Sequence, residues 1–140
     1  MLKLEEAVVG ALIAHARQDA PIEACGYLAE KAGAVSRVFR LRNVDASQEH
    51  FTLDPAEQFM AVRDMRKLGY RLRAVYHSHP ATPARPSQED IRLAQDPGVS
   101  YVIVSLAGDE PDVRSFRIVN GEVAAEEIEV VASAAAFRQG

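Results

Sequence analysis

The segment 72–90 constrains the fold of this chain more than any other stretch. Its first part, Leu72 to Tyr76, is apolar and rich in branched and aromatic residues, which is typical of a buried strand. The strand continues into a His-Ser-His sequence. Because side chains at i and i+2 share one face of a strand, His77 and His79 should point the same way. The sequence therefore predicts a buried strand that ends with two imidazoles on one face.

A helix should begin soon after this strand. Three prolines are expected to stiffen the connection, and Ser87-x-x-Asp90 is the Ser-x-x-acid pattern that begins many helices. Asp90 would then lie in the first helical turn and face back toward His77 and His79. Two imidazole nitrogens and one carboxylate oxygen suit zinc. Three protein ligands leave a fourth position open, which is typical of catalytic zinc sites and not of structural ones.

The spacing of these residues resembles the motif of the JAMM (MPN-plus) metallopeptidases, which reads His-x-His, seven residues, Ser, two residues, Asp. Seven residues separate His79 from Ser87 in this chain, and two separate Ser87 from Asp90. Glu23-Ala-Cys-Gly matches the place at which the family has a catalytic glutamate. The order of elements also fits from about residue 4 to 131. His-Ser-His-Pro and Glu-x-Cys-Gly are most similar to the small prokaryotic members.

The resemblance implies a zinc-dependent hydrolase of peptide or isopeptide bonds that uses metal-activated water and no covalent intermediate. The metal ligands would be His77, His79 and Asp90. Glu23 would act as general base and then as general acid, which requires a pKa above that of a solvated carboxylate. Ser87 would stabilise the oxyanion, cap the helix, or do both.

The rest of the chain predicts an α/β (α+β) fold with a single mixed β-sheet flanked by helices. Expected helices cover residues 5–19, 54–68 and 87–96, and expected strands cover 23–30, 35–41, 51–53, 72–79, 101–105, 113–119 and 122–131. This order agrees with the MPN/JAMM (cytidine-deaminase-like) architecture that the resemblance implies. One domain should span residues 1–140, with 132–140 as a loose tail.

Composition narrows the classes of function. With 140 residues, 48% hydrophobic and 26% charged, the chain has the size and balance of one soluble globular domain. A net charge of -4 without a basic cluster argues against nucleic acid as the main partner. The apolar stretches are too short to span a bilayer, and the N-terminus lacks a signal-peptide pattern. A single cysteine, Cys25, fits a reducing cytoplasm. A cytoplasmic protein without a membrane partner is therefore expected.

Other polar residues have simpler interpretations. Cys25 is expected to pack in the core, and His15 and His50 are expected to be ordinary surface or partly buried residues. Ser78 should face away from the metal, which disfavours a serine nucleophile. Two alternative functions remain open: a catalytically silent binding module of the MPN type, and a RadC-type protein linked to DNA repair. The acidic charge and the Glu-x-Cys-Gly segment disfavour the second alternative.

The resemblance also implies a class of substrate. Members of the family cleave after the Gly-Gly tail of ubiquitin or of ubiquitin-like proteins, and larger relatives carry inserted segments that hold ubiquitin. Because this chain is short, a ubiquitin-like sulfur-carrier protein is the expected partner. Its tail could add to a sheet edge through backbone hydrogen bonds, at the strand Val35 to Leu41 or around Phe51.

Overall fold

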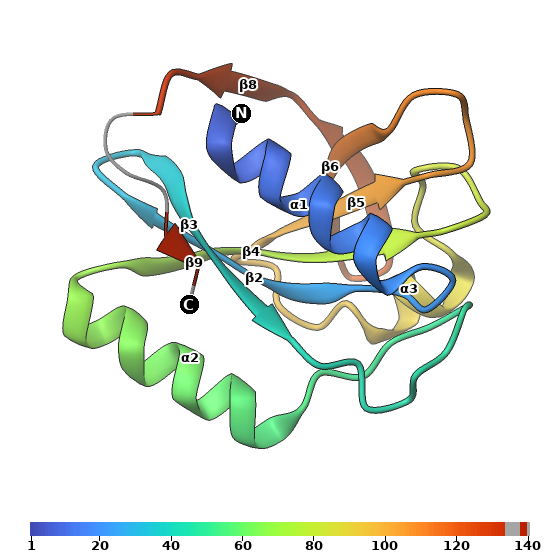
Figure 1. The fold of residues 1–140 in the computed structure, drawn as a ribbon, viewed down its shortest axis with the longest axis horizontal. Helices are drawn as coiled ribbons and strands as arrows, with labels where there is room; N and C mark the ends of the chain where they lie inside the picture. The colour runs from blue at the N-terminus through green and yellow to red at the C-terminus, as the bar shows by residue number, and fades with distance from the viewer. Residues whose placement is uncertain (134–137, 140) are drawn as a thin grey trace.

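The computed structural model describes residues 1–133 and 138–139, and within them one mixed sheet of nine strands is flanked by three helices (Figure 1). The helices are α1 (Glu6–Asp19), α2 (Pro55–Leu68) and α3 (Gln88–Leu93). The strands are β1 (Leu2–Glu5), β2 (Cys25–Lys31), β3 (Ala34–Leu41), β4 (Arg71–His79), β5 (Ser100–Ser105), β6 (Asp112–Val119), β7 (Glu122–Glu126), β8 (Ile128–Val131) and β9 (Arg138–Gln139). The sheet order is β7-β6-β5-β4-β2-β3-β1-β8, with β9 beside β3. The predicted α+β class is therefore confirmed.

The two faces of the sheet are covered by different helices, and Figure 1 shows α1 and α2 on opposite sides of it. Alternation along each strand explains this arrangement. On β2, Leu28 packs in the cluster under α1, and its neighbour Tyr27 packs in the cluster under α2. On β5, Val104 belongs to the α1 side, and Ile103 belongs to the cluster that includes Ile91 of α3. β2 and β5 are therefore buried on both faces.

β4 lies inside the sheet, antiparallel to β2 and parallel to β5. Its register against β2 shifts by one residue at Arg73, because Leu28 pairs with Ala74 while Ala29 pairs with Leu72. Such a bulge changes which residues share a face. Beyond it, Val75 packs on the α2 side, and His77 follows two residues later on the same face. The central strand thus brings the histidines to the side that α2 and α3 flank.

Local chemistry accounts for the ends of α2, which agree with the prediction. The Asp54 side chain accepts hydrogen bonds from the backbone N–H groups of Ala56 and Glu57, and Pro55 occupies the first turn. Gly69 ends the helix with φ 77°, a left-handed conformation that glycine adopts without strain. A cap, a proline and a terminal glycine are local signals, which is why the sequence predicted these bounds well.

Several expected strands have other boundaries. β1 was not predicted, and α1 begins at Glu6 directly after it. Residues 51–53 are not a strand, since Leu53 makes only an isolated bridge with Asn43. β2 starts at Cys25, so Glu23 lies just before the strand and not in it. The expected strand 122–131 is divided into β7 and β8, and β8 pairs in parallel with β1.

Two further expectations concern element ends. α3 stops at Leu93 and not near residue 96. The expected loose tail, 132–140, lies partly outside the described residues, but Arg138–Gln139 form β9 beside β3. Among the described residues, no helix has the length and apolar character needed to cross a membrane.

Candidate metal centre

The residues predicted to bind a metal come together at the end of β4. The Nε2 atoms of His77 and His79 lie 3.1 Å apart, and Asp90 Oδ2 lies 3.1 Å from the first and 3.2 Å from the second. In a tetrahedral zinc site with bonds of about 2.0–2.1 Å, ligand atoms lie roughly 3.3 Å apart. Both imidazoles are buried, with 3% and 4% of their surface exposed. The three atoms are therefore close enough to bind one metal ion.

The hydrogen bond on the far side of His79 supports this fit. His79 Nδ1 lies 2.8 Å from the carbonyl oxygen of Pro83. A carbonyl can only accept, so Nδ1 carries a proton and donates it. In a neutral imidazole Nε2 is then left with a lone pair, which faces the carboxylate oxygen of Asp90. A ring nitrogen of His79 and a carboxylate oxygen of Asp90 thus point toward the same place as a ring nitrogen of His77, which is an arrangement that can bind a cation.

A helix cap holds Asp90 in this position. The Ser87 hydroxyl accepts a hydrogen bond from the Asp90 N–H at 3.0 Å, and the Ser87 N–H donates to Asp90 Oδ2 at 2.9 Å. This reciprocal pair is a capping box at the start of α3. The predicted helix start is thus confirmed, and it directs the carboxylate toward the imidazoles of His77 and His79.

Burial and contacts act in opposite directions on the pKa values of the three groups. Burial lowers the pKa of His77, which favours the neutral form that a metal requires. Burial also acts to lower the pKa of His79, but its contacts with Asp90 and the Pro83 carbonyl outweigh this and raise it. For Asp90, burial acts to raise the pKa, and the contacts with both imidazoles outweigh it, so the pKa lies below its usual range.

Glu23 is 3% exposed and lies close enough to the ligand cluster for the charges of His79 and Asp90 to act on it. Burial raises the pKa of Glu23 to about 8. Within the described residues its Oε1 atom is buried and has no hydrogen-bond partner. Buried polar atoms are nearly always paired, so this unpaired oxygen makes Glu23 a candidate functional residue.

Other residues singled out from the sequence have structural contacts. Ser78 accepts a hydrogen bond from the Ala24 N–H at 2.7 Å, as expected for a side chain that faces away from the metal. Cys25 is buried, and burial raises the pKa of its thiol to about 12, so it packs as a neutral group. His50 pairs with Asp45 at the surface.

His15 differs from the expectation of an ordinary surface or partly buried residue. It is 4% exposed and its Nδ1 atom contacts the Tyr76 hydroxyl at 2.7 Å. Its Nε2 atom lies 3.0 Å from Asp19 one turn along α1. The spacing of His15 along α1 matches that of the buried apolar residues. This spacing indicates burial, and the prediction did not use it.

A cavity of about 280 Å³ adjoins the candidate ligands on the face between α2 and α3. His77 and Asp90 line one end of it, and Leu72 and Tyr101 line it farther along the sheet. Leu72 is five residues before His77, which corresponds to about 16 Å along a strand. The walls are mainly apolar side chains, so the cavity suits an extended chain with few charges.

The sequence did not predict the residues that support the ligands. Phe51 stacks on the His77 imidazole, with ring centroids 4.6 Å apart and planes inclined by 25°. The Ser105 hydroxyl donates to the Thr82 carbonyl at 2.6 Å and so holds the loop that carries Pro83. Asn43 donates to the Glu23 carbonyl at 3.1 Å. These contacts join segments far apart in the chain, which leaves no local sequence signal.

Most of the chain matches a known protein family. Residues 5–119 match the family model described as prokaryotic homologs of the JAB domain. The chain belongs to this family. The match contains the whole candidate centre, from Glu23 to Asp90, so the predicted JAMM resemblance is confirmed.

Two relatives with assigned names are similar over most of the chain. A CysO-cysteine peptidase of Mycobacterium tuberculosis is 39% identical over 94% of this chain and 92% of its own. A probable TtuB-protein conjugate cleaving protease of Thermus thermophilus is 37% identical over 78% of this chain and 70% of its own. Both are named for hydrolysis, which confirms the predicted class of enzyme, a JAMM-type peptidase.

Solved structures agree with this assignment. The protein DSY2949 of Desulfitobacterium hafniense has 48% identity and a TM-score of 0.86, with 94% of each chain covered. A JAB1/MPN domain protein of Archaeoglobus fulgidus has 22% identity and a TM-score of 0.66, with 93% of this chain and 97% of the other covered. At that identity the second similarity concerns the fold alone, and it confirms the MPN-type architecture.

Proposed function

We propose that the chain is a zinc-dependent hydrolase that cleaves the peptide or isopeptide bond after the C-terminal Gly-Gly of a ubiquitin-like sulfur-carrier protein. The observation that carries this proposal is the convergence of His77 Nε2, His79 Nε2 and Asp90 Oδ2 within 3.2 Å of one another. Among the residues that the structure describes, the buried Oε1 of Glu23 has no hydrogen-bond partner, which supports the proposal. A metal-free binding module on the same fold has no use for such a cluster.

The proposal gives the ligands and Glu23 distinct roles. His77, His79 and Asp90 hold zinc, which when bound lowers the pKa of water toward about 7 and polarises the scissile carbonyl. Glu23 takes a proton from the attacking water at a carboxylate oxygen and returns it to the nitrogen of the leaving amine. The raised pKa of Glu23 suits both steps, because the group can hold a proton near neutral pH.

Ser87 has two roles in the proposal, and its hydrogen bonds allow both. Its oxygen accepts the Asp90 N–H, which caps α3. The hydroxyl proton remains free to go to another acceptor. We infer that this proton is donated to the oxyanion that forms on the carbonyl during attack.

Several observations support a Gly-Gly tail as the substrate. The cavity beside His77 and Asp90 is long and mainly apolar, and glycine can lie extended there without side chains. One relative is named as a CysO-cysteine peptidase and the other as a probable TtuB-protein conjugate cleaving protease, so each name describes cleavage of a named protein joined to a second group.

The structure changes where the tail could add to a sheet edge. β3 pairs with β1 at Val35 and with β9 at Arg37 and Val38, so most of the first predicted edge is occupied. The segment around Phe51 is the remaining candidate, and its aromatic ring lies directly against His77.

Metal content is the first test. Purified protein should carry about one zinc per chain, and a chelator should abolish hydrolysis until zinc is restored. His77→Ala or Asp90→Ala should lower the zinc content markedly. His50→Ala is the matched control, because that surface imidazole pairs with Asp45 and should leave zinc unchanged. Full zinc occupancy in both ligand variants would contradict the assignment.

Substrate choice is the second test. Carrier fusions with Gly-Gly or Gly-Val before a short extension are incubated with the protein, and the products are followed by mass. A β-branched last residue adds bulk directly beside the scissile bond and should reduce the rate severely. Equal cleavage of both fusions, or brisk digestion of an unfolded protein such as casein, would indicate a general peptidase.

A further inference from the structure

The side chain of Asn43 uses its whole hydrogen-bonding capacity inside the protein. Its Nδ2 atom donates to the carbonyl oxygens of Glu23 at 3.1 Å and His50 at 3.0 Å. Its Oδ1 atom accepts from the N–H groups of Asp45 and Thr52, each at 3.1 Å. An amide offers two donors and two such acceptor positions, and Asn43 is only 9% exposed. A buried amide with every bond made fixes the segments that it joins.

One of these segments is the backbone of Glu23, which lies outside β2 and therefore lacks the hydrogen bonds of a strand. Its carbonyl accepts from Asn43, and its N–H donates to the Ser47 carbonyl at 2.9 Å. The loop 43–53 thus holds both polar groups of the Glu23 backbone. On the other side, Ala24 is fixed to β4 by the hydroxyl and the N–H of Ser78.

The same loop also contacts a candidate metal ligand. Phe51 lies between His50 and Thr52, the residues whose backbone groups bond to Asn43. Its ring stacks on His77 at 4.6 Å between centroids. The Asn43 amide is therefore connected to Glu23 through the Glu23 backbone. It is also connected to the His77 imidazole through Phe51.

We propose that Asn43 is a positioning residue, whose amide holds Glu23 at the distance from the ligand cluster that proton transfer requires. This inference rests on the proposed hydrolase function. Asn43 is not one of the candidate ligands, so its effect must pass through a residue that its loop contacts, which is Glu23 or, by way of Phe51, His77. The proposal assigns the effect to Glu23. A displacement of about 1 Å in a catalytic group can reduce a rate by about 10²-fold, so one hydrogen bond to its backbone can matter strongly.

The direct test is Asn43→Asp, which keeps the shape and the Oδ1 acceptor but replaces the Nδ2 donor with an oxygen. That oxygen would face the carbonyl oxygens of Glu23 and His50 and push them away. We expect kcat for a Gly-Gly carrier fusion to fall about 10- to 100-fold. KM should change by less than about threefold, and zinc content should stay near that of the wild type. Asn120→Asp is the control, because it makes the same chemical change in the turn between β6 and β7.

A double-mutant cycle separates positioning from a general structural role. Glu23→Gln alone should reduce the rate by about 10²–10⁴-fold. If Asn43 acts through Glu23, adding Asn43→Asp to that variant should cause little further loss in single-turnover rate. A purely structural effect would reduce the rate of both backgrounds by the same factor.

The outcomes are distinct. A wild-type protein without zinc-dependent cleavage would overturn the proposed function and not this inference alone. With an active wild type, full activity of Asn43→Asp, or equal losses in both backgrounds, would overturn the positioning role. If Asn43→Asp does not fold, Asn43→Ala takes its place, since it removes the bonds without adding a charge. Failure of both to give folded, zinc-loaded protein would assign Asn43 to fold stability and overturn the proposal.

Discussion

At the scale of single residues, one atom of Asp90 links helix formation to the candidate metal centre. Its Oδ2 accepts the Ser87 N–H of the capping box and also faces both imidazoles. The bond from the backbone N–H limits the rotation of the carboxylate before any metal arrives. Ligand geometry is thus fixed by the same local interaction that starts α3, which is a form of preorganisation.

Ser87→Ala separates the two roles of that serine. Loss of the side-chain cap should cost about 1 kcal/mol of folding free energy, which thermal or urea unfolding would measure. Zinc content should persist, because the Ser87 backbone N–H still bonds to Asp90. If the hydroxyl also serves the oxyanion, the rate should fall about 10²–10³-fold. A stability loss with an unchanged rate would limit Ser87 to capping.

The pKa of Glu23, raised to about 8 by burial, makes a prediction about the metal-free protein. In the unfolded chain its pKa is near 4.5. Between pH 4.5 and 8 the unfolded state therefore releases the Glu23 proton while the folded state keeps it. The free energy of unfolding falls as the pH rises through this range. The slope is at most about 1.4 kcal/mol per pH unit.

Unfolding free energies of metal-free wild type and Glu23→Gln at pH 5 and pH 8 give the test. The wild type should lose stability relative to the variant over this interval. Glu122→Gln, an exposed residue of β7, serves as the control for loss of a carboxylate. Parallel pH curves for wild type and Glu23→Gln would mean that Glu23 is solvated in the metal-free protein.

At the scale of elements, the sequence predicted what local chemistry determines. Asp54 with Pro55 marked the start of α2, and Asn120-Gly121 marked the hairpin turn, where both residues have positive φ. β1 escaped prediction because its four residues lead directly into α1. The parallel pairing of β1 with β8 joins the two ends of the chain, and no periodicity within either strand indicates its partner.

The residues of the candidate centre also divide into those that local sequence patterns predicted and those that they did not. The three ligands and Ser87 lie within one stretch of fourteen residues. The strand alternation and the helix start that place them could therefore be recognised in the same segment of sequence. Glu23 was predicted through resemblance, although its place outside β2 was not. Asn43 could not be predicted, because an asparagine in a polar loop is typical of any turn. Its role depends on a backbone carbonyl twenty residues earlier.

Gly26 in β2 is required by the close approach of two elements, and its replacement is a prediction at this scale. A Cβ atom there would lie 2.4 Å from the Phe39 carbonyl oxygen and 2.6 Å from the Tyr76 ring. Neither backbone nor a buried ring can move away easily, so Gly26→Ala should destabilise the fold by about 1–3 kcal/mol or more. Thermal unfolding would measure the loss.

Gly10 in α1 provides the matched control, since no atom of the described part of the chain lies within 4 Å of a Cβ added there. Gly10→Ala should raise stability by about 0.5–1 kcal/mol through helix propensity. If Gly26→Ala were also stabilised, β2 would have to be able to move away from β3 and β4 at this position. The close contacts at Gly26 would then not limit the size of the residue there.

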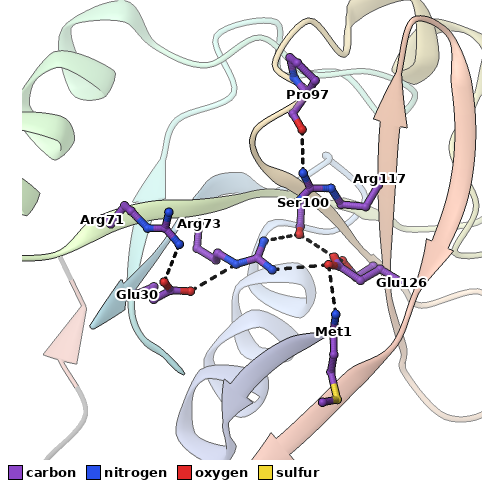
Figure 2. Close-up of polar contacts among 9 residues, drawn as sticks. Met1, Glu30, Arg71, Arg73, Pro97, Ser100, Arg117 and Glu126 are labelled. Atoms are coloured by element: carbon purple, nitrogen blue, oxygen red, sulfur yellow. Dashed lines mark hydrogen bonds and ion pairs between the residues drawn. The ribbon is translucent and has the colours of Figure 1, made fainter. Parts of the chain in front are cut away.

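At the scale of the whole molecule, a charged network ties distant parts of the sheet together at the end of β4 opposite the histidines. Figure 2 shows Arg73 of β4 between Glu30 of β2 and Glu126 of β7, at 3.2 and 3.4 Å. The Met1 amino group lies 3.8 Å from the same Glu126 carboxylate. The bulge at Arg73 and the candidate centre thus occupy opposite ends of one strand, about 13 Å apart for four residues. Stability and chemistry should therefore be separable by mutation.

Glu126→Gln tests this separation. Burial acts to raise the pKa of Glu126, but hydrogen bonds from the Ser100 and Ser115 hydroxyls and the charge of Arg73 outweigh it and lower the pKa. A carboxyl whose pKa is lower in the folded state stabilises the protein above its unfolded pKa, and this contribution is lost as the pH falls through the folded value. At pH 7 the variant should therefore be less stable than the wild type, by about 1–3 kcal/mol for lost hydrogen bonds to a charged group.

Because the wild-type carboxylate becomes protonated in acid, the gap between the two proteins should shrink as the pH is lowered from 7 toward 3. Urea unfolding across this range measures the gap, with exposed Glu122→Gln of the same strand as the control. The rate of hydrolysis at pH 7 and low temperature should equal that of the wild type, since Glu126 does not contact the centre. A gap independent of pH would show that the shape of the side chain, and not its charge, stabilises the network. A slower folded variant would mean that the two ends of β4 are coupled.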